Sequence, residues 1–175
     1  MGARGSVQTA TLVSMAGKEV LMSPKAHGTC TTAVQANLRW GVDWETADRI
    51  CCFNRHYAEH SGYFLTTRFM DAKPEDGEPI TFYDSVSGKP LYRAPQGRTW
   101  EQFIAESRAH GWPSFRDQEC VTDNMRVLSN GEVVSVDGTH LGHNLPDSNG
   151  NRYCINLVSV AGTPPGDPNQ QCAEE

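Results

Sequence analysis

A tight-turn signal between two β-rich runs is the feature that most constrains this 175-residue chain. Asn130-Gly131 lies between residues 125–128 and residues 133–136, which are rich in apolar and β-branched side chains. Asn-Gly favours the two-residue turns that join antiparallel strands, because both residues tolerate positive φ. The sequence therefore predicts a β-hairpin here, and with it an antiparallel sheet in the C-terminal half.

Two further parts of the chain have the composition of strands. Residues 80–83 and 91–92 flank a turn that contains Gly88 and predict a second hairpin, and residues 153–160 predict a core strand. No internal repeat is visible. Sheet structure is therefore expected in the middle of the chain as well as near its C-terminal end.

Helices are predicted at two places. Apolar residues at helical spacing, with Asp43 as the N-cap, predict a helix over residues 43–60. Thr99 is placed to cap a second helix over residues 100–110, and Gly111 follows as its end signal.

The length of the chain suits one domain with its own core. We expect residues 1–40 to form a partly disordered N-terminal extension, residues 41–162 the folded domain, and residues 163–175 a disordered tail. Gly2, with a serine at position 6, fits the N-myristoylation pattern, so weak membrane association is one expectation for the N-terminus.

Charge and hydropathy exclude several classes of function. The formal net charge is −6, and the 15 Lys and Arg residues are spread along the chain, which argues against nucleic acid as a partner. No run approaches the roughly 20 apolar residues of a transmembrane helix, and no secretory signal is visible. We therefore expect a monomeric intracellular protein, in the cytoplasm or an organelle, whose cysteines are thiols.

Two short clusters combine residues that can carry chemistry. One is a turn-like segment around an indole, and the other holds a thiol, a guanidinium, two imidazoles, a carboxylate and an amide. They are Gly111-Trp112-Pro113-Ser114-Phe115 and His140-Leu141-Gly142-His143, Asp147, Arg152-Tyr153-Cys154-Ile155-Asn156.

The second cluster is suited to thiol chemistry. On a strand, Arg152, Cys154 and Asn156 share one face, because side chains alternate with a period of two. A neighbouring guanidinium favours thiolate over thiol and lowers a cysteine pKa from about 8.5 toward neutrality. His140 and His143 could supply the proton that such a nucleophile needs.

Each of these residues also has an ordinary structural interpretation. Cys154 in an apolar strand could be a small buried side chain, and Trp112 beside a proline could belong to the core. Asp147 could form a turn and Arg152 could be solvated. The pair of histidines could also bind a metal together with Cys154.

Taken together, the motifs resemble the type B methionine-R-sulfoxide reductases, the peptide-methionine (R)-S-oxide reductase family. That family carries Gly-Trp-Pro-Ser-Phe, then His-Leu-Gly-His, then Arg-Tyr-Cys-(Ile/Val)-Asn, and all three segments occur here in order. The resemblance is strong over residues 110–160 and weak before them. It implies a mainly β fold of two antiparallel sheets with peripheral helices.

The resemblance also implies roles for single residues. Cys154 would be the nucleophile that attacks the sulfoxide and becomes a sulfenic acid. The remaining roles are activation of Cys154 by Arg152 and Asp147, handling of the sulfoxide oxygen by His140, His143 and Asn156, and binding of the substrate by Trp112 and Phe115. The expected substrate is methionine sulfoxide, free or in proteins, and the expected function is protein repair with no bound cofactor.

This chain departs from the family at its usual zinc site and beside its substrate pocket. The positions that match the four zinc-binding cysteines of many members are Asp84, Ser87, Val134 and Asp137, so we expect no zinc there. A family phenylalanine near the pocket is Leu145, and the loop before Arg152 is shorter.

A common position of the resolving cysteine is His110 in this chain. We therefore expect Cys51, Cys52 or Cys120 to resolve the sulfenic acid, with Cys30 and Cys172 as alternatives, or an external thioredoxin-like dithiol to reduce it directly. Two other functions stay open: a Cys/His hydrolase, and a non-catalytic module that binds oxidised methionine.

Overall fold

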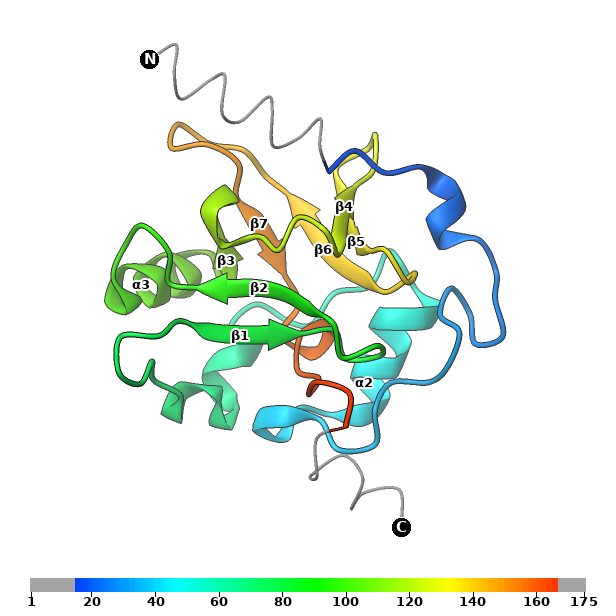
Figure 1. Ribbon diagram of the computed structural model, residues 1–175, viewed down its shortest axis with the longest axis horizontal. Coiled ribbons are helices and arrows are strands. Elements are labelled where there is room, and N and C mark those ends of the chain that lie inside the picture. The colour runs from blue at the N-terminus through cyan, green and yellow to red at the C-terminus, as the bar shows by residue number, and fades with distance from the viewer. Residues whose placement is uncertain (1–14, 167–175) are drawn as a thin grey trace.

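The protein, described by a computed structural model over residues 15–166, contains two antiparallel sheets with short helices around them (Figure 1). The smaller sheet pairs β1 with β2, and the larger one has the order β3-β7-β6-β5-β4. The strands are β1 (Ile80–Tyr83), β2 (Pro90–Ala94), β3 (Ser114–Phe115), β4 (Met125–Val127), β5 (Glu132–Ser135), β6 (His140–Asn144) and β7 (Tyr153–Ile155). The predicted fold class and both predicted hairpins are confirmed.

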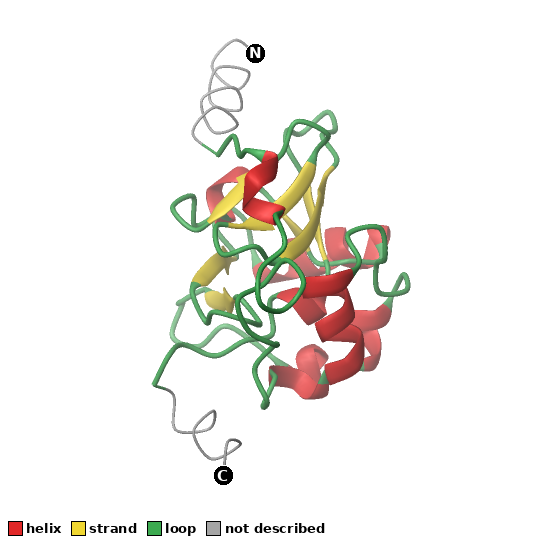
Figure 2. Ribbon diagram, turned by 90° about the vertical axis from the view of Figure 1, so that its right-hand side faces the viewer, coloured by secondary structure: helices red, strands yellow, loops and turns green. Residues whose placement is uncertain are grey.

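The helical segments are short, and most of them lie on one side of the strands (Figure 2). Within residues 15–166 the α-helices are α2 (Trp44–Asp48) and α3 (Trp100–His110). A π-helical turn, η3 (Arg49–Phe53), continues α2, and the 3₁₀ turns are η1 (Glu19–Met22), η2 (Arg39–Gly41), η4 (Tyr63–Thr66), η5 (Arg68–Asp71), η6 (Asp117–Glu119) and η7 (Leu157–Ser159).

Aromatic side chains join the two sheets in the core. Phe115 of β3 stacks on Tyr92 of β2, with ring centroids 4.2 Å apart, and it meets Phe82 of β1 edge-on at 5.0 Å. Phe103 of α3 packs against the same ring at 5.3 Å. All four side chains are fully buried. These contacts hold the small sheet and α3 against β3 and thereby fix the end of the large sheet on which Cys154 lies.

The first predicted helix begins where expected but is shorter than predicted. Asp43 caps it by accepting a hydrogen bond from the amide of Thr46 at 2.9 Å. The helix ends at Phe53 instead of residue 60, because Asn54 is extended and its side chain accepts a hydrogen bond from the amide of His56. Residues 55–58 are thereby released from the helix and line a cleft.

The second predicted helix is confirmed in its bounds and its cap. The side chain of Thr99 accepts from the amide of Gln102 at 3.0 Å, and the side chain of Gln102 accepts from the amide of Thr99 at 2.8 Å. This reciprocal arrangement satisfies two amides that the helix leaves unpaired. Gly111 follows with φ of 94°, a conformation that favours glycine.

The predicted strand over residues 153–160 is wrong beyond Ile155. After that residue the chain forms the turn η7, in which the amides of Leu157 and Val158 donate to the carboxylate of Glu59 at 2.9 and 3.1 Å. Amides that are committed to a side chain cannot pair with a neighbouring strand. Tertiary contacts have therefore overridden the β-propensity of this segment.

The described part of the N-terminal segment belongs to the folded body. Met15 is fully buried, its carbonyl accepts from the amide of Val127 at 2.8 Å, and the amide of Gly17 donates to the carbonyl of Val127 at 3.0 Å. Gly2, the rest of residues 1–14, and residues 167–175 with Cys172 lie outside the described residues. Within residues 15–166, no helix has the length and apolar character needed to span a membrane.

A buried carboxylate links the turns of the two sheets at the positions that match the family zinc site. Asp84, which follows β1, accepts from the amide of Val86 at 2.8 Å and from the hydroxyl of Thr139, just before β6, at 3.0 Å. Burial raises the pKa of Asp84, although these hydrogen bonds oppose the rise. Asp137 instead forms an ion pair with Lys89 at 3.1 Å. Val134 offers no ligand atom, so these positions do not fit a tetrahedral zinc ion.

We predict that Thr139→Val lowers the free energy of unfolding by about 1–3 kcal/mol, because the buried Asp84 carboxylate loses a donor that no water replaces. Chemical denaturation measures the change. Thr122→Val, at an exposed threonine, is the matched control. Equal stability of the two variants would show that the hydrogen bond does not hold the sheets together.

Candidate functional site

A cleft of about 260 Å³ lies over β6 and β7. Its walls come from β6, from the end of β7, from the indole after α3 and from the segment that leaves η3. The lining residues are Arg55, His56, Tyr57, Ala58, Trp112, His140, Gly142, His143, Leu145, Cys154 and Asn156. The structure thus brings together five of the residues predicted from the sequence: the thiol, both imidazoles, the amide and the indole.

Cys154 lies on β7, between β3 and β6, and is half-buried. It pairs with Ser114 of β3 on one side and with His143 of β6 on the other. Gly142 permits the close approach of β6, because a Cβ atom there would lie 2.0 Å from the carbonyl oxygen of Cys154. The position of the sulfur is therefore set by backbone pairing on both sides.

The electrostatic surroundings of this thiol differ from the expectation. Burial raises the pKa of Cys154, Arg152 acts against that effect through its charge and a hydrogen bond, and the charge of Glu59 adds to the rise. The predicted influence of Arg152 has the expected sign, but the prediction that the pKa of Cys154 is lowered is wrong, because burial outweighs that influence. Cys154 therefore rests as a protonated thiol at neutral pH.

Arg152 and Asp147 support the thiol from outside the cleft. The guanidinium of Arg152 is buried, donates to the hydroxyl of Ser114 at 3.4 Å and lies 3.8 Å from Asp147. Asp147 is held by Arg116 at 3.0 Å, and this hydrogen bond lowers the pKa of Asp147. Neither residue lines the cleft. Arg152 places its positive charge near the sulfur, and Asp147 lies beside that guanidinium.

His140 is oriented by a charged pair that the sequence did not reveal. Its Nδ1 atom donates to the carboxylate of Glu132 at 2.7 Å, and Arg55 holds the same carboxylate through its Nε atom at 3.1 Å. Burial favours the protonated form of Glu132, but the hydrogen bonds from His140 and Arg55 outweigh it and lower its pKa. Glu132 is thus an anion that accepts from Nδ1 and leaves Nε2 for a ligand.

Glu59 is a second functional residue that sequence reasoning missed. Its amide donates to the side chain of Asn156 at 3.0 Å, and its carbonyl accepts from the indole of Trp112 at 3.0 Å. It thereby joins two walls of the cleft. Burial raises the pKa of Glu59 to about 7, although its hydrogen bonds from Leu157 and Val158 oppose the rise. It lies inside the predicted helix over residues 43–60, where a glutamate carries no sign of burial.

Four other predicted site residues do not line the cleft. Phe115 is fully buried in the aromatic core, so it supports β3 instead of contacting a ligand. Cys51 lies against Ser159 at 3.7 Å, Cys52 is also buried, and Cys120 lies near the carbonyl of Arg116. In the described conformation none of these three thiols shares the cleft with Cys154.

The raised pKa of Glu59 predicts a pH-dependent stability. The pKa of about 7 in the folded protein exceeds the ordinary value of 4.5. Below pH 4.5 the carboxyl is protonated in both the folded and the unfolded state, so its ionisation does not lower stability there. As the pH rises toward 7 this carboxyl ionises first in the unfolded chain, and the free energy of unfolding falls by about 3 kcal/mol.

The variant Glu59→Gln has no such carboxyl. The unfolding free energy of the wild type relative to this variant should therefore fall by about 3 kcal/mol between pH 4 and pH 8. Denaturation curves of both proteins at each pH measure it. A constant difference would contradict the burial of an ionisable group at this position.

No family model matches this chain, and among the curated proteins that it matches is one with a partial similarity. Over 90 residues the chain is 38% identical to the peptide methionine sulfoxide reductase MsrB of Staphylococcus saprophyticus. The match covers 45% of this chain and 58% of that protein. The chain therefore spans little more than half the length of the curated relative, and this similarity supports the family relation that the three motifs indicated.

Proposed function

We propose that the protein reduces the R epimer of methionine sulfoxide to methionine, with Cys154 as the nucleophile. The observation that carries the proposal is one cleft in which Cys154, His140 and Trp112 meet. The partial similarity to a methionine sulfoxide reductase supports the same chemistry.

In the proposed reaction the sulfur of Cys154 attacks the sulfur of the sulfoxide. The sulfoxide S–O bond breaks, its oxygen passes to Cys154, and the products are methionine and a cysteine sulfenic acid. The thiol proton ends on the transferred oxygen, so no water is released in this step. Cysteine is oxidised by two electrons and the substrate is reduced by two.

The surrounding residues would lower the barrier in distinct ways. Arg152 stabilises the thiolate as it forms, which the raised pKa of the resting thiol makes necessary. His140, oriented by Glu132, takes the thiol proton of Cys154 on Nε2 and passes it to the sulfoxide oxygen. The indole of Trp112 packs against the methyl group of the substrate and places the sulfur in line with Cys154.

We further propose that an external dithiol of the thioredoxin class recycles the sulfenic acid directly. Its first thiol condenses with the sulfenic acid, releases water and forms a mixed disulfide, which its second thiol then breaks. No other thiol of the described residues lines the cleft. Resolution by Cys51, Cys52 or Cys120 would instead require the chain to move.

The proposal is tested with dithiothreitol and the separated R and S epimers of a blocked methionine sulfoxide. The wild type should consume only the R epimer, and Cys154→Ser should consume neither, as followed by chromatography of the product. Consumption of R by the serine variant would overturn the role of Cys154. Binding of the R epimer without turnover by the wild type would favour a binding module, and hydrolysis of esters would favour a hydrolase.

The pairing of Glu132 with His140 predicts a second kinetic effect. Glu132→Gln should lower kcat by about tenfold or more, because the imidazole loses the anion that orients it as a proton donor. Glu19→Gln is the matched control, since exposed Glu19 also pairs with Arg55 but does not contact His140. Equal kcat values for the two variants would remove Glu132 from the proposed mechanism.

A further inference from the structure

A second cluster of reactive side chains lies away from the cleft, where the N-terminal segment crosses α2 and η3. The Nε2 atom of His27 is 2.9 Å from a carboxylate oxygen of Asp48. Together with the sulfur of Cys52, the ligand atoms of these residues all lie within 4.8 Å of one another. None of the three residues lines the cleft that holds Cys154.

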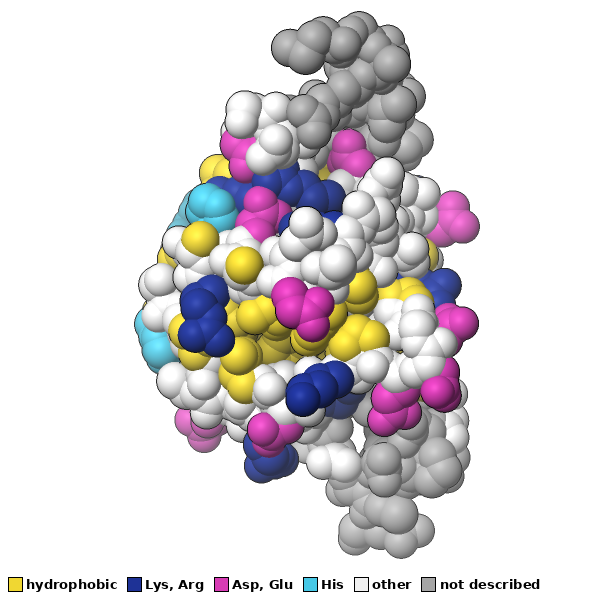
Figure 3. Space-filling model, turned by 90° about the vertical axis from the view of Figure 1, so that its left-hand side faces the viewer, with side chains coloured by type: hydrophobic (Ala, Val, Ile, Leu, Met, Phe, Trp, Pro, Cys, Tyr) yellow, Lys and Arg dark blue, Asp and Glu magenta, His cyan; other side chains and the backbone are white. Residues whose placement is uncertain are grey.

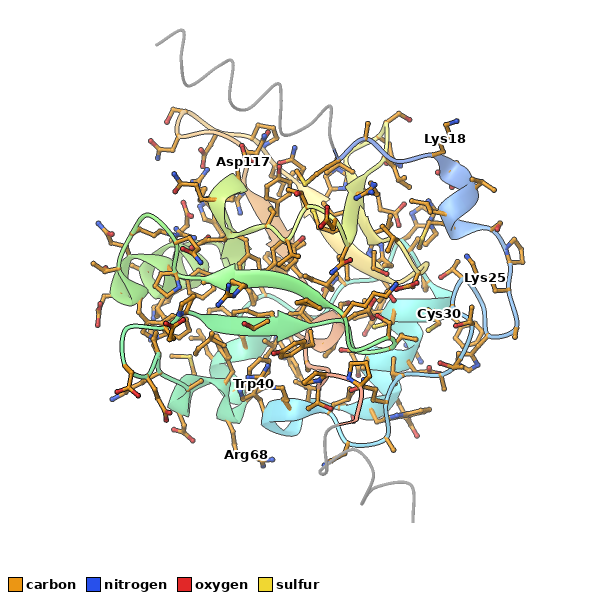
Figure 4. The ribbon with its side chains drawn as sticks, viewed as in Figure 1. Lys18, Lys25, Cys30, Trp40, Arg68 and Asp117 are labelled. Atoms are coloured by element: carbon orange, nitrogen blue, oxygen red, sulfur yellow. The ribbon has the colours of Figure 1, made fainter. Side chains whose placement is uncertain are left out.

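The backbone holds these side chains together from both directions. Asp48 and Cys52 are four residues apart on the continuous helix of α2 and η3, so they lie on one face. The loop that carries His27 is closed by two hydrogen bonds of 2.9 Å between the backbones of His27 and Cys30. Figure 4 labels Cys30, which lies where this segment passes the helix.

The loop also docks directly on η3. The amide of Thr29 donates to the carbonyl of Cys52 at 2.9 Å. Gly28 has φ of 60°, and a Cβ atom there would lie 1.9 Å from the same carbonyl oxygen. Only glycine permits this approach, so the loop brings His27 to the helix in a fixed position.

The local environment is partly closed and poor in other partners for the sulfur. The side chains of His27 and Asp48 are 28% and 15% exposed, whereas Cys52 is 1% exposed. The Cys52 thiol interacts with the thiol of Cys30 and otherwise has a long contact of 4.0 Å with the carbonyl of Thr32. Phe53 packs edge-on against the His27 ring, with centroids 4.6 Å apart, and restrains it.

We propose that His27, Asp48 and Cys52 bind a divalent cation of borderline softness, with Zn²⁺ as the preferred ion. One nitrogen, one oxygen and one sulfur ligand suit zinc, while magnesium and calcium prefer sets made of oxygen alone. Zinc bonds of about 2.0–2.3 Å place tetrahedral ligands roughly 3.3–3.8 Å apart, so only small shifts are needed.

Binding neutralises the charge of a half-closed site. The ion displaces the thiol proton of Cys52, and His27 moves its proton from Nε2 to Nδ1 so that Nε2 can coordinate. Zn²⁺, one carboxylate, one thiolate and a neutral imidazole sum to zero charge. Three protein ligands leave a fourth position for water or for the thiol of Cys30.

This site is separate from the positions at Asp84, Ser87, Val134 and Asp137, and it does not depend on the proposed reductase activity. Its consequence is a link between the N-terminal segment and the helix. A Cys52 thiolate held by the ion is also withdrawn from redox chemistry.

The test uses the full chain, stripped with a chelator and titrated with Zn²⁺ against a chromophoric competitor. The wild type should bind about one ion and gain thermal stability, and Mg²⁺ should do neither. Cys52→Ser and His27→Gln should each lose affinity by about tenfold or more. His27→Gln guards against misfolding, because this side chain is partly exposed and glutamine keeps a donor for Asp48.

Cys120→Ser is the control, since its sulfur lies elsewhere in the fold and its zinc affinity should equal that of the wild type. The proposal would be overturned if the wild type did not bind zinc. It would also be overturned if Cys52→Ser and His27→Gln both bound zinc as tightly as the wild type.

Discussion

The cleft depends on one buried residue, Glu59, whose backbone and side chain connect the three segments that form its walls. Its backbone holds the indole of Trp112 and the amide of Asn156, and its carboxylate caps the turn after β7. The bonds to Asn156 and Leu157 are buried and that to Trp112 is partly buried, so losing either buried bond leaves a polar group without a partner. The cleft and the end of β7 are therefore coupled parts of one arrangement.

The same carboxylate affects the chemistry of the sulfur. Burial raises the pKa of Cys154, Arg152 lowers it, and the charge of Glu59 adds to the rise. The resting protein therefore keeps a protonated thiol in the cleft. For the proposed reaction this means that the thiolate forms only when an acceptor for its proton is present, which limits reaction with other electrophiles.

Sequence reasoning predicted the elements that follow from local chemistry. The turn at Asn130-Gly131, the cap at Thr99 and the glycine at position 111 act within a few residues, so their patterns were sufficient. The helix prediction failed after Phe53 because Asn54 is extended and its side chain accepts from the amide of His56, whereas the strand prediction failed after Ile155 because of a long-range contact. Glu59 joins these two segments across the fold, and no local pattern encodes that contact.

The candidate site was likewise predictable only where its residues lie within short sequence motifs. The two motifs identified the thiol and the imidazoles, which lie on the neighbouring strands β6 and β7, and the indole, which lies just before β3. Glu132 and Arg55 were missed, because they are separated by 77 residues and their pairing exists only in three dimensions. Phe115 was given a substrate-binding role because it belongs to the Trp112 motif, but its side chain points to the other face of the sheet and fills the core.

The face that carries the Cys154 cleft and the face that carries α3 expose different kinds of side chain. On the side that carries α3, hydrophobic side chains gather among charged ones (Figure 3), and a shallow apolar groove there includes Phe69, Trp100 and Ile104. The Cys154 cleft combines apolar walls with a thiol and imidazoles, whereas the charged side chains that line this groove are Lys73, Glu101 and Arg108.

The buried link between Asp84 and Thr139 has a further consequence. It joins the two sheets with a carboxylate and a hydroxyl, neither of which is attacked by peroxide or removed by a chelator. A thiolate-bound metal at this place would be vulnerable to both. The scaffold can therefore keep its shape under the oxidising conditions in which methionine sulfoxide forms.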